Sequence, residues 1–105
     1  LKTIIMDRYC FFMNSTSDAI LLPVNNILGI DATAADALSI TFKEIGGAAD
    51  EASVALNITS GKAKEVMNAI VDEISFSRNP FVVIADDVNS VYVHPDLTTC
   101  GTITP

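Results

Sequence analysis

Hydrophobic and polar residues alternate along two neighbouring segments in the middle of the chain. From Leu38 to Ile45, positions 38, 40, 42 and 45 are apolar and the positions between them are polar or small. From Ser53 to Ile58, positions 54, 56 and 58 are apolar in the same way. Such alternation is typical of strands with one buried face. Because the Gly-Gly turn that joins them is short, the two segments are predicted to form an antiparallel hairpin.

A different spacing marks the segment from Gly61 to Ser75. Its apolar residues recur at i, i+3, i+4, i+7, i+8 and i+11, which places them in one stripe along a helix. These residues are Ala63, Val66, Met67, Ile70, Val71 and Ile74. Thr59 or Ser60 is suited to cap the start, and Pro80 limits the end. One amphipathic helix is therefore predicted at about residues 61–75.

Shorter apolar runs predict further strands at residues 2–13, 19–23, 27–31, 81–85, 91–94 and 98–104, separated by turn-forming residues. The run at 81–85 is continuously apolar and suits a central strand. Five strands, a helix and three strands predict an α+β fold. We expect a predominantly antiparallel β-sheet or small barrel, with about six to eight short strands and the helix packed on one face.

Composition adds a reason to expect a partner. The 105 residues suit a single domain, 1–105, yet half of them are hydrophobic and the mean hydropathy is +0.41. A chain this short leaves much of its surface exposed. The apolar surplus therefore predicts either a surface covered by another subunit, which we favour, or a core rich in Ala, Val and Ile.

Charge and segment length exclude several classes of protein. Thirteen acidic against six basic residues give a net charge of −7, which repels nucleic-acid phosphates and anionic membranes. No apolar run reaches the roughly 18–20 residues that span a bilayer. The stretch Ile4–Met13 is interrupted by Asp7 and Arg8 and lacks the layout of a secretory signal. We expect a soluble, cytoplasmic protein that binds neither nucleic acid nor membrane.

The two cysteines, Cys10 and Cys100, lie near opposite ends of the sequence in apolar surroundings. A bridge between them would stabilise the fold by roughly 4 kcal/mol in the chain-entropy model. Two cysteines do not make a disulfide framework, and a buried thiol packs as a small hydrophobic group. Free thiols are therefore the favoured interpretation, and the bridge remains open.

No catalytic or cofactor motif is present. The stretch Thr59-Ser60-Gly61-Lys62 resembles a phosphate loop only superficially, because Leu56 stands where the first glycine belongs and Ala63 follows the lysine. No Gly-x-Ser-x-Gly elbow occurs, and His94 is the only histidine. We expect no enzyme and no cofactor.

The helix start remains a weak candidate site for an anion or an acidic partner. Lys62 and Lys64 lie in the first turn and Asp72 and Glu73 in the last, which is opposite to the charges that the helix dipole favours. Backbone amides and ammonium groups together attract anions. The candidate contact residues are Ser60, Gly61, Lys62 and Lys64. The alternative is a pair of solvated lysines.

A second cluster contains Asp86, Asp87, His94 and Asp96. Carboxylates with an imidazole can bind a divalent cation, but these residues lack regular calcium-loop spacing and include too few histidines for a typical zinc site. Acidic turn residues explain the same positions. No metal is expected.

Two stretches carry a resemblance to a known group of proteins. Residues 21–30 with the hairpin from Leu38, and residues 58–74 with 81–87 and 98–104, together resemble small virion structural proteins of marine bacteriophages, especially cyanophages. The resemblance implies a capsid-associated or decoration role, with this chain itself and other virion proteins as partners, in a virion made in the host cytoplasm. Residues 23–30 are also similar to the opening of LytTR-type DNA-binding domains, whose basic loops this acidic chain lacks.

The leading hypothesis is a non-enzymatic, homo-oligomeric structural protein of a phage virion. The alternative is a module that binds a small anion or phosphate ligand near Gly61–Lys64. An enzyme that uses His94 or Asp86 ranks third.

Overall fold

The computed structural model describes residues 8–43, 51–76 and 79–104. In this part of the chain, five strands, one α-helix and three further strands follow one another as predicted. They are β1 (Tyr9–Ser15), β2 (Asp18–Pro23), β3 (Ile27–Ala34), β4 (Ala37–Phe42), β5 (Ala52–Ile58), α1 (Ala63–Phe76), β6 (Phe81–Asp86), β7 (Val91–Tyr92) and β8 (Leu97–Thr104). A turn of 3-10 helix, Val24–Asn26, forms the predicted bend between β2 and β3. The predicted start of the first strand and the Gly-Gly turn lie outside the described residues.

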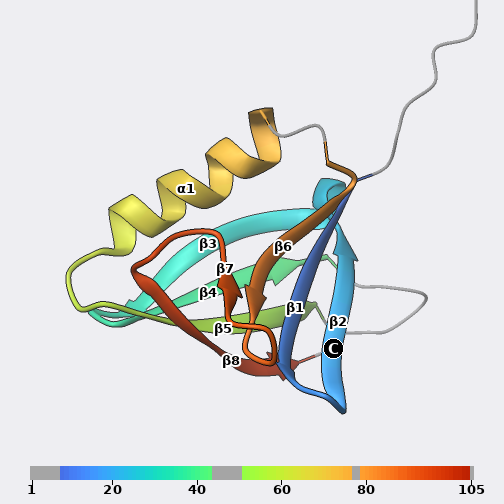
Figure 1. The fold of residues 1–105 in the computed structure, drawn as a ribbon. Coiled ribbons are helices and arrows are strands. Elements are labelled where there is room, and N and C mark those ends of the chain that lie inside the picture. Colours follow the sequence, from blue (N-terminus) through green and yellow to red (C-terminus); the bar gives the residue numbers. More distant parts are fainter. Residues whose placement is uncertain (1–7, 44–50, 77–78, 105) are drawn as a thin grey trace, which may run out of the picture.

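The strands form two four-stranded sheets (Figure 1). The first sheet has the order β2-β1-β6-β7, and the second has the order β3-β4-β5-β8. All neighbouring strands are antiparallel except β1 and β6, which are parallel. The α+β, predominantly antiparallel fold is thus confirmed. The alternative prediction, a small closed barrel, is not what the structure shows. The strands form two separate hydrogen-bonded sheets that do not join into one.

The predicted hairpin is formed by β4 and β5. Leu38 lies opposite Leu56, and Ile40 opposite Val54. These apolar side chains are buried, while Ser39 and Thr41 between them are only partly covered. Alternation along the sequence therefore gave both the strand type and the inward face correctly.

The helix prediction is confirmed, with one correction to its apolar stripe. Val66 and Ile70 are fully buried, and the other stripe residues Ala63, Met67 and Ile74 pack partly buried against the core. Val71, also assigned to the stripe, is 50% exposed. It lies about 100° around the helix from Ile70, at the margin of a stripe that is wider than the strip of core beneath it.

The core fills the space between the two sheets and α1. Phe12 of the first sheet and Phe42 of the second meet there edge to face, with ring centroids 6.0 Å apart. At the rim, the Asn14 side-chain amide donates to the Gly101 carbonyl at 3.0 Å and so connects β1 with β8. Within the described ranges, no helix is long and apolar enough to cross a membrane.

Candidate functional site

The first sheet is apolar on the face that points away from the core. Along β1, Cys10 and Phe12 are buried, whereas Tyr9, Phe11 and Met13 are only partly covered. Successive side chains of a strand point to opposite faces, so these last residues point outward. In a strand with one wet face, polar residues would occupy such positions.

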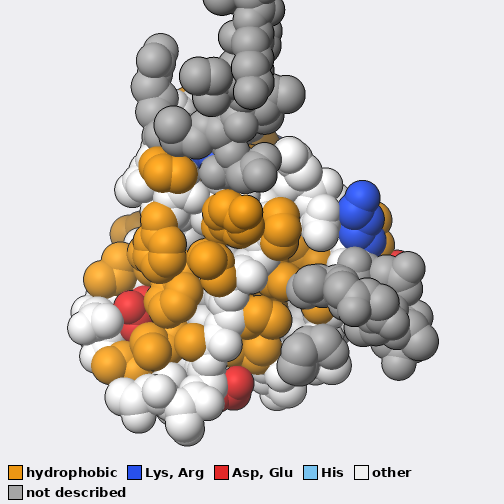
Figure 2. Space-filling model, turned by 90° about the vertical axis from the view of Figure 1, so that its right-hand side faces the viewer, with side chains coloured by type: hydrophobic (Ala, Val, Ile, Leu, Met, Phe, Trp, Pro, Cys, Tyr) orange, Lys and Arg blue, Asp and Glu red, His pale blue; other side chains and the backbone are white. Residues whose placement is uncertain are grey.

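The neighbouring strands continue this pattern. The registers place Leu21 of β2 and Val83 of β6 on either side of Phe11. We call the outward residues of these three strands the outer face; they are Tyr9, Phe11, Met13, Ala19, Leu21, Pro23, Phe81 and Val83. None of these eight residues carries a charge, but the register places the buried carboxylate Asp86 of β6 beside Met13 at one end of this face. Figure 2 views the molecule from the side of β1 and β2 and shows hydrophobic side chains gathered across it.

An aromatic pair lies near the middle of the outer face. The rings of Phe11 and Phe81 are tilted against each other with centroids 5.1 Å apart. Phe81 on one side and Leu21 on the other are each 45% exposed. A sheet with two apolar faces is normally covered on both. Here the described chain buries one face and covers the other only in part, so the outer face is suited to bind an uncharged surface.

The sequence held a signal for this face. The continuous apolar run 81–85 indicated a strand buried on both sides, and residues 9–13 contain no charge. The sequence did not show that the strands from these runs become direct neighbours, because they are 65 or more residues apart. Only their pairing turns two apolar segments into one surface.

The structure places three of the predicted anion-site residues, Ser60, Gly61 and Lys62, in the turn before α1, and the fourth, Lys64, in the first turn of the helix. Gly61 has a φ of 81°, a left-handed conformation that glycine adopts without strain. The backbone amides of this turn are already used: Thr59 donates to Asp96 at 2.8 Å, Gly61 to Ala35 at 3.0 Å, and Lys62 to Thr59 at 3.1 Å. The glycine thus has a structural role, and these amides are engaged within the chain.

The lysines at the helix start also have an acidic neighbour. Glu65 lies in the first turn of α1, and its carboxylate is 4.0 Å from the Lys62 ammonium group. Both side chains are about half exposed, so water screens the pair. Glu65 is an acid where the helix dipole favours one, and it reduces the positive charge that the candidate anion site relies on.

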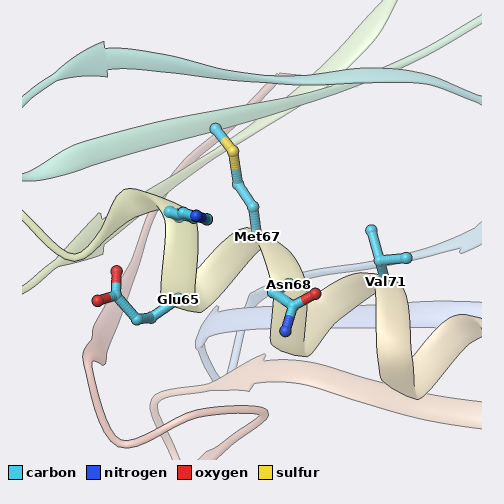
Figure 3. A pocket seen from close by; sticks show the side chains of 5 residues that line it. Glu65, Met67, Asn68 and Val71 are labelled. Carbon is cyan, nitrogen blue, oxygen red and sulfur yellow. The ribbon is translucent and has the colours of Figure 1, made fainter.

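A shallow hollow of about 550 Å³ lies beside α1, lined by Lys64, Glu65, Met67, Asn68 and Val71. In Figure 3, Met67 extends from the helix towards the strands, whereas Glu65 and Asn68 point away from them. The lining includes one ammonium group and one carboxylate. This mixture favours no particular charge of ligand.

The carboxylates considered for metal binding serve as local hydrogen-bond acceptors. Asp86 is buried and accepts from the backbone amides of Val88 and Asn89 at 3.1 Å each, and from the Asn89 side chain at 2.8 Å. These bonds, chiefly that from the Asn89 side chain, lower the pKa of Asp86. The ionised carboxylate therefore holds the turn between β6 and β7.

Asp87 connects this turn with β8. Its Oδ1 atom accepts from the Tyr92 hydroxyl at 2.7 Å and from the Cys100 amide at 2.9 Å. The hydrogen bond to Asp87, together with burial, raises the pKa of Tyr92 to about 12. Tyr92 thus remains a neutral donor at physiological pH.

His94 and Asp96 are close, but their contact is also structural. The Nδ1 atom of His94 accepts from the Asp96 backbone amide at 3.0 Å and lies 3.7 Å from its carboxylate. The closer contact makes Nδ1 an acceptor, which leaves the proton of the neutral ring on Nε2. Across the residues that the structure describes, no three His, Cys, Asp or Glu side chains gather as a metal site.

Cys10 and Cys100 are both buried and not bonded to each other. Burial is the main cause that raises the pKa of Cys10 to about 11 and that of Cys100 to about 12. Thiols in this state are poor nucleophiles, because the thiolate is the reactive form. Both cysteines act as small core residues.

Comparison with known proteins finds no relative of this chain. No protein-family model matches the chain, and neither a curated protein nor a solved structure matches it.

Proposed function

We propose that this chain is a non-enzymatic structural subunit of a phage particle and that it assembles through the outer face of the first sheet. The observation that carries the proposal is the outer face itself, an uncharged apolar surface on a strand-paired scaffold. Monomeric proteins rarely expose large apolar patches, and those that are exposed usually mark a protein interface. Rigid strands also keep such a surface in one shape, which favours binding over catalysis by mobile loops.

The polar side chains of the chain favour a structural role over an enzymatic one. Asp86, Asp87 and His94 are the residues that acid–base chemistry would need, and each is held in a local hydrogen bond. Both thiols are buried and protonated. The placement of this protein in a phage particle rests on the resemblance of its sequence to virion structural proteins of marine phages.

The protein composition of purified phage particles tests this proposal. Phage particles whose genome encodes this chain should be purified on a density gradient and treated with nuclease. They should then contain the chain in a fixed ratio to the major capsid protein. A chain found only in the unassembled fraction of the lysate contradicts the proposal.

The alternative, an anion- or phosphate-binding module at Gly61–Lys64, remains a prediction with less support. Lys62 lies near Glu65, and the amides of Gly61 and Lys62 already donate within the chain. No observation at the helix start favours a ligand over solvent.

A further inference from the structure

We propose that His94 is a pH-sensitive latch on the turn that precedes α1. The neutral ring of His94 closes the turn of residues 94–97, and this turn holds the backbone of Thr59, where the connection to the helix begins. Protonation of the ring removes the hydrogen bond that closes the turn and so loosens the start of the helix. The latch is separate from the outer face and goes beyond the proposed function.

The latch is a single hydrogen bond made by the His94 ring. Its Nδ1 atom accepts from the backbone amide of Asp96 at 3.0 Å. An imidazole nitrogen accepts a hydrogen bond only while it carries no proton. Protonation turns Nδ1 into a donor that faces another donor, so this bond is lost when the ring becomes charged. Histidine is the side chain whose charge ordinarily changes between about pH 5 and 8.

The carboxylate of Asp96 offers the charged ring a second contact. Its Oδ2 atom lies 3.7 Å from the same Nδ1 atom, and the two side chains are 27% and 30% exposed. The proton that Nδ1 takes from water therefore points to the carboxylate after a small movement. That movement exchanges the amide of Asp96 for its carboxylate as the partner of the ring. The turn is rearranged, while His94 stays beside Asp96.

Asp96 supplies the one carboxylate that the described chain places against the ring. The strands beside the turn, β5 and β8, contain no charged residue. The other charged side chains on the surrounding segments are Asp36 before β4, Lys62, Lys64 and Glu65 at the start of α1, and Asp86 and Asp87 at the end of β6. None of their carboxylates lies within 4.0 Å of a ring nitrogen of His94.

A backbone hydrogen bond carries the change to the start of the helix. The carbonyl oxygen of Asp96 accepts from the Thr59 amide at 2.8 Å, and the amide of the same Asp96 is the group that His94 holds. A movement of Asp96 therefore acts directly on Thr59. The amide of the preceding residue, Ile58, donates instead to Asp36 at 2.9 Å. These two neighbouring amides should thus respond differently to pH.

Amide hydrogen exchange of the full chain, followed by NMR at about pH 7.5 and about pH 5.5, tests the latch. The rates are corrected for the effect of pH on an unstructured amide. We expect the protection of Thr59 to fall about three- to tenfold at the lower pH, as the loss of one hydrogen bond predicts. The protection of Ile58 should change less than about twofold. Both pH values lie above the ordinary pKa range of carboxyl groups, so a change between them reports the histidine.

Two variants fix the latch in one state each. In His94→Asn, the side-chain oxygen accepts from the amide two residues on, as Nδ1 does, but it takes no proton. This variant should keep the high protection of Thr59 at both pH values. His94→Ala removes the acceptor, so it should show the low protection at both.

The nitrogen chemical shifts of the His94 ring give a measurement that needs no variant. At about pH 8 they should show the proton of the neutral ring on Nε2. A proton on Nδ1 overturns the proposal, because Nδ1 would then not be an acceptor. Protection of Thr59 that does not depend on pH, or a pH dependence that His94→Asn retains, also overturns it. The composition of purified particles tests the proposed function separately from all of these results.

Discussion

At the scale of single residues, the carboxylates that the sequence offered as candidate metal ligands act as hydrogen-bond acceptors that hold the fold together. Asp86 and Asp87 follow each other in the chain but serve different partners. Asp86 holds its own turn through Val88 and Asn89, whereas Asp87 reaches Tyr92 and the distant Cys100 amide. Adjacent residues on a strand end point in different directions, so their proximity in sequence did not make a paired site.

The lowered pKa of Asp86 predicts a specific acid sensitivity. A carboxyl group whose pKa falls on folding stabilises the protein above its ordinary value of 3.8, and that stability is lost as the pH falls through the folded-state pKa. Asp86→Asn should lower the free energy of unfolding by about 1–2 kcal/mol at pH 7, because hydrogen bonds to a charged acceptor are the stronger ones. Its urea-unfolding curves should also depend less on pH below about 5.

Asp31→Asn is the control for this change, since Asp31 is exposed on β3. Its pH dependence should follow that of the unchanged protein. An Asp86→Asn variant with the same acid sensitivity as the unchanged protein would show that Asp86 does not cause it.

At the scale of elements, the last turn of α1 has no basic residue of its own, and an arginine from another part of the chain lies there instead. The sequence places Asp72 and Glu73 at the C-terminal end, where the helix dipole favours positive charge. The structure brings Arg8, just before β1, to this end. Its guanidinium group donates to the carbonyl oxygens of Glu73, at 3.0 Å, and of Ile74. A residue 65 positions away thus completes the helix terminus.

Removal of this guanidinium group should destabilise the protein. We expect Arg8→Ala to lower the free energy of unfolding by about 1–3 kcal/mol, because it leaves helix carbonyls without donors and removes a favourable charge. Arg8→Lys should recover part of the loss, since it restores the charge but not the planar pair of donors. Chemical denaturation followed by circular dichroism measures both.

Lys64→Ala provides a contrast at the other end of α1. This exposed lysine stands where the dipole disfavours a cation, so its removal should leave stability unchanged or raise it by a few tenths of a kcal/mol. A loss equal to that of Arg8→Ala would contradict the assignment of the two ends.

At the scale of the whole molecule, two sheets share one core. Phe12 and Phe42 come from different sheets, are both fully buried, and are in edge-to-face contact. Their contact joins segments that no hydrogen-bonded ladder connects. The sheets should therefore unfold together in one transition.

A double-mutant cycle measures this connection. Phe12→Leu and Phe42→Leu should each destabilise the protein, and the double variant should lose about 0.5–1.5 kcal/mol less than the two losses added. The pair Phe12→Leu and Val71→Ala is the control, because Val71 is an exposed helix residue and its change should add independently. Strict additivity for Phe12 and Phe42 would indicate that the sheets are not coupled through these rings.

Most of the elements were predictable from the sequence because their signals are local. The alternation at 38–42 and 53–58 and the helical stripe from Ala63 each depend on neighbours within a few residues. The assignment of Val71 to the buried stripe was wrong, since its burial depends on how wide the core beneath the helix is. The parallel pairing of β1 with β6 was not predictable, because four strands and the helix lie between the two in the sequence and no local pattern reports their contact.

The sequence by itself thus determined which segments become strands and which becomes the helix, and it showed a high content of apolar residues for a chain of this length. Only the tertiary structure decided where those residues lie. Periodicity reports the inward face of each element, but whether the opposite face is covered depends on which distant elements become neighbours. Here β2, β1 and β6 meet with apolar residues on both sides, and the described chain buries just one of them.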